Sequence, residues 1–233
     1  TQERPQNPDP GSLRFNTDSK HLEYFRGDTL GWVEVEASYE NDSLPESGGY
    51  TGFIAGGNDP NPWTALNTID YVNIATFGDS TDFGDLESGK TQSQAVCNKT
   101  RAIWPGGYTG GGYQIHISYN NIQSKGNGVD YGDLIGVKNQ APSIATQTRG
   151  IIGQAANQNS SPYVSNVLEY VTISTTGNTI NFGDGQEKSS CFGCCSTTRG
   201  LWGAPGNTPT NVIYTTISTL GDTTDFGTSP NRP

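Results

Sequence analysis

The chain has 233 residues, of which 31% are hydrophobic and 15% charged, and it contains 31 glycines. Exposed helices usually carry far more Glu, Lys and Arg, so this composition favours an all-β fold. The formal net charge of −10 repels phosphate backbones and anionic lipid headgroups, so neither nucleic acid nor a membrane is an expected partner.

The first 37 residues are predicted to form an arm and a small sheet. Residues 1–10 contain three prolines and no strongly apolar side chain, so we expect residues 1–12 to be an extended arm that only a partner orders. Three apolar runs separated by turn residues come next: Ser12–Phe15, His21–Phe25 and Gly31–Val33. They predict a three-stranded β-meander over residues 13–37. Residues 38–49 are rich in Asn, Ser and Gly, which is typical of a linker.

Residues 50–233 contain a motif that occurs four times. Each copy has a Tyr, an Ile three positions later and a Gly four further on, followed by Asp or Asn, an aromatic residue and Gly. The copies are Tyr71–Gly84, Tyr119–Gly132, Tyr170–Gly183 and Tyr214–Gly227, at spacings of 48, 51 and 44 residues. A second half-motif alternates with the first at Thr100–Trp104, Thr148–Ile152 and Thr198–Trp202, with a degenerate copy at Tyr50–Gly57.

Each repeat offers about four short strand candidates separated by Gly, Asn, Asp and Pro. Four-stranded units at this spacing are typical of propeller blades, so we predict a small β-propeller of about four blades with four short strands each. A β-solenoid is the alternative, although its repeats are usually shorter. The first repeat lacks an opening strand, and we predict that Trp32–Ala37, which alternates apolar and polar residues, supplies it and helps to close the ring.

Two family resemblances follow from these motifs. The segment Gly11–Asp18, followed by Leu22–Phe25 and Gly31–Trp32, resembles a short module common in the fibre and appendage proteins of tailed phages. The repeats, with their Thr-Arg-Gly, Tyr-Val-Thr-Ile and Asp-Phe-Gly-Asp segments, resemble kelch-like repeats in structural proteins of marine cyanobacterial phages. The resemblance implies a component of the virion, assembled in the host cytoplasm, that sits on the head or in a tail appendage.

The sequence shows no set of residues that predicts an enzyme. The two histidines, His21 and His116, lie far apart and fit no metal-binding spacing, and His116 is interpreted as a packing or surface residue. No Gly-x-Ser-x-Gly elbow frames a nucleophile. We therefore assign no catalytic, cofactor-binding or metal-binding residue and expect no cofactor. A hydrolase acting on host surface polysaccharide stays a further alternative, because sequence alone cannot place two carboxylates at catalytic separation.

The four cysteines have two interpretations. Cys191, Cys194 and Cys195 are clustered and Cys97 stands alone, which is not the even distribution of a disulfide framework and favours synthesis in a reducing cytosol. One CxxC pair is too little for a structural zinc site. In the repeat alignment Cys195 takes the position of Cys97 and Ala145, and Cys194 that of Val96 and Ile144, so these thiols are expected to be small buried side chains.

Repeated charged residues also have a functional and a structural interpretation. Acidic turn residues recur three apart: Asp79, Asp82 and Asp85; Asn127, Asp130 and Asp133; Asn178, Asn181 and Asp184. They suit Ca²⁺, yet such residues also stabilise turns, and Gly78, Gly126, Gly177 and Gly221 beside them favour turns. Arg101, Arg149 and Arg199 recur with Asp85, Asp133 and Asp184. They predict either a polar ring that binds a ligand or, as strict repetition favours, Arg–Asp pairing within or between blades.

Aromatic residues fall into two groups. Phe83, Tyr131, Phe182 and Phe226 share one repeat position and are expected in the core. Trp63, Tyr108 and Tyr113 lie in Gly- and Pro-rich loops, where exposed rings stack on sugars.

Together, the motifs and the resemblance lead to one main hypothesis of function. We expect a non-enzymatic virion protein, a capsid decoration or accessory protein, anchored to other virion proteins by its N-terminal region with the propeller projecting outward. The alternative is a tail-fibre or appendage protein that binds a host receptor or a host-surface glycan. Assembly into homo-oligomers is compatible with either.

Overall fold

The structure is a computed structural model, and it describes residues 5, 7–18, 21–27, 29, 31–35, 51–156, 164–186, 192–203 and 211–228. The chain divides into two compact units, residues 1–42 and 43–233. All regular elements of the described residues are β-strands, arranged in small antiparallel sheets. The all-β class expected from the composition is therefore confirmed.

The first unit contains a three-stranded meander made of β1 (Leu13–Asn16), β2 (His21–Phe25) and β3 (Trp32–Val35). Its register pairs Phe15 with Leu22 and Phe25 with Trp32. The rings of Phe25 and Trp32 lie 5.5 Å apart, and the carboxylate of the fully buried Glu23 forms an ion pair with Arg14 at 3.5 Å.

The role predicted for Trp32–Ala37 is wrong over the described residues. Trp32–Val35 forms β3, which pairs with β2 inside the first unit and not with the repeats. Its alternating pattern marks a strand correctly, but the neighbouring hairpin partner lies much closer along the chain than the first repeat. Local pairing needs less loop closure, so it is favoured over the distant pairing. Ala37 lies outside the described residues.

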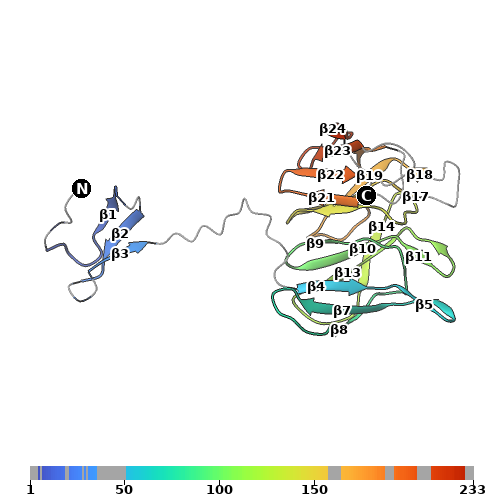
Figure 1. Ribbon diagram of the computed structural model, residues 1–233, viewed down its shortest axis with the longest axis horizontal. Coiled ribbons are helices and arrows are strands. Elements are labelled where there is room, and N and C mark those ends of the chain that lie inside the picture. Colours follow the sequence, from blue (N-terminus) through green and yellow to red (C-terminus); the bar gives the residue numbers. More distant parts are fainter. Residues whose placement is uncertain are drawn as a thin grey trace. The chain divides into compact units, whose positions relative to one another are not determined.

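In the described part of the second unit, each repeat forms one sheet of three or four strands (Figure 1). The first comprises β4 (Thr51–Ala55), β7 (Thr68–Asn73) and β8 (Thr81–Asp85). The second comprises β9 (Val96–Cys97), β10 (Arg101–Pro105), β13 (His116–Asn121) and β14 (Val129–Asp133). The third comprises β15 (Ser143–Ala145), β16 (Arg149–Ile152), β19 (Val167–Thr172) and β20 (Ile180–Asp184). The fourth comprises β21 (Phe192–Cys195), β22 (Arg199–Gly203), β23 (Asn211–Thr216) and β24 (Thr224–Thr228).

In each of the first three sheets, a small two-stranded hairpin lies in the chain between two paired strands: between β4 and β7, between β10 and β13, and between β16 and β19. The hairpins are β5–β6 (Asn58–Pro60, Trp63–Ala65), β11–β12 (Tyr108–Thr109, Gly112–Tyr113) and β17–β18 (Ala155–Ala156, Val164–Ser165). The first two occupy the Gly- and Pro-rich segments around Trp63, Tyr108 and Tyr113 that the sequence marks as loops.

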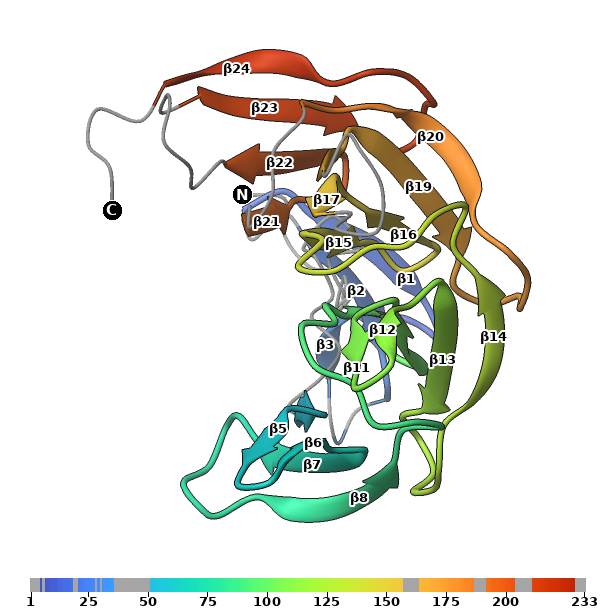
Figure 2. The same cartoon turned by 90° about the vertical axis from the view of Figure 1, so that its right-hand side faces the viewer.

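The four sheets follow one another in chain order along a curved row (Figure 2). The strands β8, β14, β20 and β24 run along its outer side, and β8 and β24 lie at opposite ends of the row in both views (Figures 1 and 2). Three sheets have the expected four strands, whereas the first has three within the described residues. No hydrogen bond between described residues connects the fourth sheet to the first.

Neighbouring sheets are connected by a repeated hydrogen-bonded joint. In each joint, the turn before the outer strand of one sheet binds the outer strand of the preceding sheet. The turn glycine donates its N–H to the carbonyl of the repeated aromatic residue, as in Gly126 to Phe83, Gly177 to Tyr131 and Gly221 to Phe182. The residue two further on donates to the Asp that closes the strand, as in Gly128 to Asp85, Thr179 to Asp133 and Thr223 to Asp184.

This joint requires glycine on the outer strands as well. Gly183 has a φ of +149°, and a Cβ there would lie 2.2 Å from the carbonyl oxygen of Gly221 in the next sheet. Only a residue without a side chain lets the two backbones approach so closely. The recurrent Gly after the aromatic residue is thus explained by contact between sheets.

Among the described residues of the second unit, the hydrophobic core forms three clusters, each between two neighbouring sheets. Phe83, Tyr131 and Phe182 belong to one cluster each, with exposures of 6%, 2% and 1%. Phe226, expected in the core with them, is 54% exposed, so that prediction is wrong. The reason is positional: no described sheet follows the fourth one to cover its outer strand, and a repeat buries its apolar face only against a neighbour.

Candidate functional site

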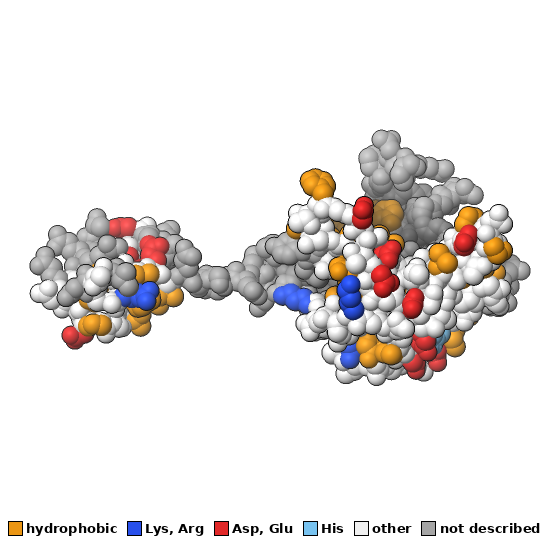
Figure 3. All heavy atoms as spheres, turned by 90° about the horizontal axis from the view of Figure 1, so that it is seen from below, with side chains coloured by type: hydrophobic (Ala, Val, Ile, Leu, Met, Phe, Trp, Pro, Cys, Tyr) orange, Lys and Arg blue, Asp and Glu red, His pale blue; other side chains and the backbone are white. Residues whose placement is uncertain are grey.

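A histidine and two carboxylates meet where the first sheet adjoins the second. His116 begins β13, Asp130 lies on the neighbouring β14, and Glu87 follows β8 of the preceding sheet. A β-bulge between Ile117 and Ser118 shifts the register of β14, and bulges commonly redirect side chains in this way. On the face drawn in Figure 3, acidic side chains gather beside the histidine of the second unit.

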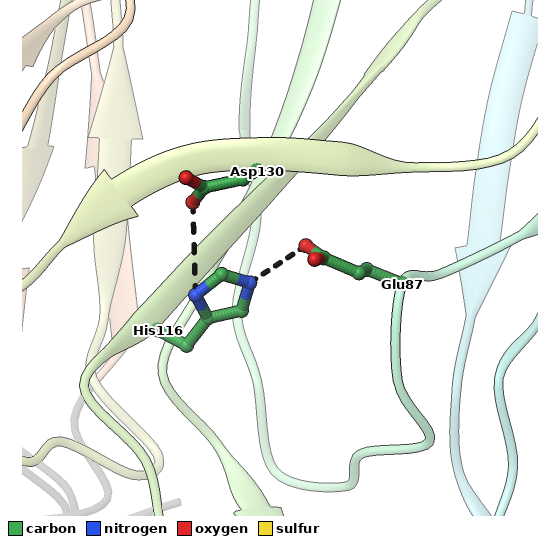
Figure 4. Close-up of side chains that lie close together, drawn as sticks. All are labelled: Glu87, His116 and Asp130. Carbon is green, nitrogen blue, oxygen red and sulfur yellow. Dashed lines mark hydrogen bonds and ion pairs between the residues drawn. The ribbon is translucent and has the colours of Figure 1, made fainter.

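Both ring nitrogens of His116 face carboxylates (Figure 4). Nε2 lies 2.7 Å from Oε2 of Glu87, and Nδ1 lies 3.7 Å from Oδ1 of Asp130. Asp133 adds a third carboxylate, with its Oδ1 3.8 Å from Nδ1. The imidazole is 31% exposed and the carboxylates more so, so solvent screens these attractions.

The donor set of this cluster also suits a divalent cation. Ligand atoms of Glu87, His116 and Asp130 lie within 4.8 Å of one another, and imidazole with carboxylates is a common set for transition metals. However, Nε2 is already hydrogen-bonded to Glu87, and every member is accessible to solvent. The geometry is that of a surface hydrogen-bonded cluster that connects two sheets.

Sequence reasoning did not find this cluster because its members are 14 and 29 residues apart and form no motif. One signal was present in the repeats. The position of His116 is occupied by Thr68, Val167 and Asn211 in the other copies, as the strand registers show. All four residues differ, so the position varies between repeats and leaves room for a side chain with a role of its own.

Two buried lysines were also missed. Lys90 and Lys138 stand seven residues after the repeated aromatic residue and are each 2% exposed. Lys90 Nζ donates to the carbonyl of Trp104 at 3.3 Å, and burial lowers its pKa to about 8 against the opposing pull of Glu87. Lys138 Nζ donates to the carbonyls of Gly153 and Val167 and lies 3.3 Å from Oε1 of Glu169. Burial lowers the Lys138 pKa, and Glu169 opposes that shift.

Each lysine fixes the loop in which it lies to backbone carbonyls of the next repeat. Although a lysine of lowered pKa is also a candidate base or nucleophile, both ammonium groups are directed at backbone carbonyls and covered by protein. Their repeat position and their partners indicate a structural role.

The repeated arginines form contacts between sheets, but not with aspartate. The guanidinium of Arg101 donates to the carbonyl of Ile173 at 3.0 Å, and that of Arg149 donates to Ile217 at 2.6 Å, each in the following sheet. They also lie over Tyr119 and Tyr170 at 4.7 and 4.6 Å. The Arg–Asp pairing expected from the sequence does not occur among the described residues. A backbone carbonyl and an aromatic ring take the place of the carboxylate as partners of Arg101 and Arg149.

The Asx residues of the turns act between sheets. Oδ1 of Asn127, Asn178 and Asp222 accepts the backbone N–H of Asp85, Asp133 and Asp184 at 3.1, 3.0 and 2.8 Å. Each turn glycine has a positive φ, from +149° to +157°, as expected for tight turns. The turn interpretation is thereby supported, with the addition that the side chain caps the neighbouring sheet and not its own turn.

The cysteine alignment is confirmed, but the expected burial is not. Cys97, Ala145 and Cys195 pair with equivalent positions of the next strand. Cys97 and Cys194 are nevertheless exposed and Cys195 is half-buried, with its thiol donating to Ala145. Cys97 alternates away from the covered side of its edge strand, and Cys194 belongs to the last repeat, which no described sheet covers. Cys191 lies outside the described residues.

The three loop aromatics lie together on two neighbouring hairpins. The ring of Trp63 on β6 is 5.5 Å from that of Tyr108 on β11, which is 5.1 Å from that of Tyr113 on β12. Trp63 is 46% exposed and both tyrosines are half-buried. The hairpins thus place an aromatic surface at the junction of the first and second sheets.

No helix long and apolar enough to cross a membrane occurs among the residues that the structure describes. No protein-family model matches the chain, and no curated protein matches it at a significant level.

Proposed function

We propose that this protein is a non-enzymatic structural component of a phage virion, a capsid decoration or accessory protein held to the particle by its N-terminal unit. In this proposal its four sheets are the blades of a kelch-like propeller that projects outward. The up-and-down order of the strands and the face-to-face packing of neighbouring sheets support the blade assignment. The family resemblance of the repeats supports the virion assignment.

One observation carries the proposed anchor. Four large apolar side chains of the meander are exposed: Leu13 (66%), Phe15 (55%), Leu22 (41%) and Val35 (37%). Leu13 and Phe15 are two apart on β1, Phe15 pairs with Leu22, and Leu22 pairs with Val35, so all four share one face of the sheet. A contiguous apolar face on so small a unit is typical of a protein interaction site.

The anchor is tested by charging that face. Replacing Leu13 and Phe15 by Asp together is expected to lower incorporation into particles by at least about tenfold, because each buried apolar side chain contributes about 1.5–3 kcal/mol to binding. Incorporation is measured as protein copies per purified particle by quantitative mass spectrometry. The matched control is Ile180→Asp, which charges a 56% exposed position of the second unit. Normal occupancy of the double variant would rule the anchor out.

The aromatic surface favours a second function, binding of a host-surface glycan. Trp63, Tyr108 and Tyr113 present rings with an apolar body and a polar edge, which suits the mixed surface of a sugar. Glycan-array binding by the whole protein is expected to be lost in Trp63→Ala and kept in the control Phe192→Ala, which removes a 57% exposed ring far along the chain. Absence of binding by the unaltered protein would eliminate this alternative.

A further inference from the structure

The two ends of the row of sheets carry complementary halves of the joint. Each of the three joints in the chain uses the same three hydrogen bonds: turn Gly N–H to the aromatic carbonyl, strand-end N–H to an Asx Oδ1, and a turn N–H back to the strand-end carbonyl. A row of four sheets has three such joints and leaves one half at each end.

The outer edge of β24 is the first half. Thr228 pairs with Asn211 as Asp85 pairs with Thr68, so its N–H and carbonyl face away from β23, as does the carbonyl of Phe226. No described residue binds these three groups. The ring of Phe226 is 54% exposed, although its three equivalents are buried.

The turn before β8 is the second half. The N–H groups of Gly78 and Ser80 and the Oδ1 of Asp79 correspond to the groups that form the joint in the other three repeats, and no described residue binds them. Gly78 has a φ of +157°, against +149° to +152° in the other turns, so the turn already has the binding conformation. Phe77 in this turn is fully exposed.

Two further contacts of the internal joints lack one partner at each end of the row of sheets. Arg101 and Arg149 each donate to the Ile carbonyl of the following sheet, whereas Arg199 lies over its own Tyr214 at 5.1 Å with no carbonyl among the described residues. The Ile at the equivalent position of the first sheet is Ile74, which is 68% exposed while Ile173 and Ile217 are buried.

The second contact concerns glycine packing. Val96 and Ile144 pack on Gly150 and Gly200 of the next sheet, where an added Cβ would lie 2.8 and 1.9 Å from their side chains. Cys194 takes that position in the last sheet and is exposed, and Gly52 is the equivalent glycine of the first.

We propose that a second copy of the chain docks head to tail, with the turn Phe77–Ser80 of one copy binding the edge of β24 in the other and Arg199 reaching the carbonyl of Ile74. The two halves lie at opposite ends of one chain (Figures 1 and 2), so they meet between copies and not within one. The contact is heterologous and yields a ring where the rotation closes and an extended row where it does not. It rests on the repeat geometry and does not depend on attachment to a virion, but it requires that the four blades do not close into a ring within one chain.

Cross-linking between two single variants tests the contact directly. Chains carrying Asp79→Cys are mixed with chains carrying Thr228→Cys under mild oxidation, and a linked heterodimer is expected on a non-reducing gel. The equivalent internal pair, Asp85→Cys with Asn127→Cys in one chain, is the positive control for disulfide geometry, and the parent chain controls for its native cysteines. Failure to form the heterodimer while the internal pair links would overturn the proposal. So would a linked monomer as the main product of a chain carrying both Asp79→Cys and Thr228→Cys.

Sedimentation equilibrium supplies an independent readout. The unaltered protein is expected to show concentration-dependent self-association. Asp79→Ala or Arg199→Ala is expected to raise the dissociation constant of the self-association by about tenfold, as loss of one or two interfacial hydrogen bonds does. Asp82→Ala, which removes an exposed charge from the same sheet, is the matched control. A monomer at every concentration, or association equal in all variants, contradicts the proposal.

Discussion

Replacing Glu169 by Ala is expected to lower the free energy of unfolding by about 3–5 kcal/mol, because it leaves a buried ammonium without its anionic partner. Glu169 and Lys138 are 1% and 2% exposed, and Oε1 lies 3.3 Å from Nζ. The other carboxylate oxygen accepts the backbone N–H of Ile135 at 2.8 Å and the hydroxyl of Thr179. One substitution therefore removes the only carboxylate that these three donors share and leaves the Lys138 ammonium with the neutral carbonyls of Gly153 and Val167.

Urea unfolding at pH 7 measures this effect, and two variants make it specific. Glu87→Ala breaks an exposed carboxylate–histidine contact and is expected to cost less than about 1 kcal/mol. The double variant Lys138→Met/Glu169→Leu removes both charges, and it is expected to be more stable than Glu169→Ala, because apolar pairs often replace buried ion pairs at little cost. A loss below about 1 kcal/mol in Glu169→Ala would show that water reaches Lys138.

Raising the pH from 7 to 10.5 is expected to stabilise the protein by about 3 kcal/mol relative to Lys90→Met. Burial lowers the pKa of Lys90 from 10.5 to about 8 in the folded state. Below pH 8 Lys90 is protonated in both the folded and the unfolded state, so the difference in free energy of unfolding between the protein and the variant is constant. Between pH 8 and 10.5 the unfolded chain binds more protons than the folded one, so the free energy of unfolding rises with pH. Above 10.5 the difference is constant again.

The comparison with a variant removes the other titrating groups from the measurement. Burial raises the pKa of Tyr131 to about 12, which acts in the opposite direction above pH 10, but it does so equally in both proteins. Lys90→Arg serves as a second reference, since a guanidinium does not titrate in this range. Urea midpoints measured at half-unit steps of pH give the difference, and a flat profile against both references would refute the lowered pKa.

The repeat alignment predicted a large part of the fold. The recurrence of the aromatic residue and Gly located the outer strands, and the turn glycines located the tight turns, because both features come from backbone conformations that few residues adopt. The meander was visible from local alternation and turn chemistry. These signals are short-range, so a single sequence contains them in full.

The sequence did not reveal the burial and the contacts that depend on which sheet lies next to a residue. Equal repeat positions suggested equal burial, yet Phe226 and Cys194 are exposed because they belong to the last sheet. The arginines bind carbonyls of the following sheet and not the nearby Asp, since a backbone acceptor leaves no trace in sequence. Lys90 likewise binds a backbone carbonyl of the next sheet, and His116 contacts Glu87, which follows a strand of the preceding sheet.

The joint between sheets consists of main-chain groups, one Asx side chain and glycines, and it is the same wherever it occurs in the chain. A duplication or deletion of one whole repeat would therefore create no new kind of contact and would leave both ends of the row unchanged. The joint itself therefore sets no limit on the number of sheets, and the hairpins β5–β6, β11–β12 and β17–β18 take no part in the joint. The segments that connect the sheets and the hairpins that add surface to them are thus separate parts of the same repeat.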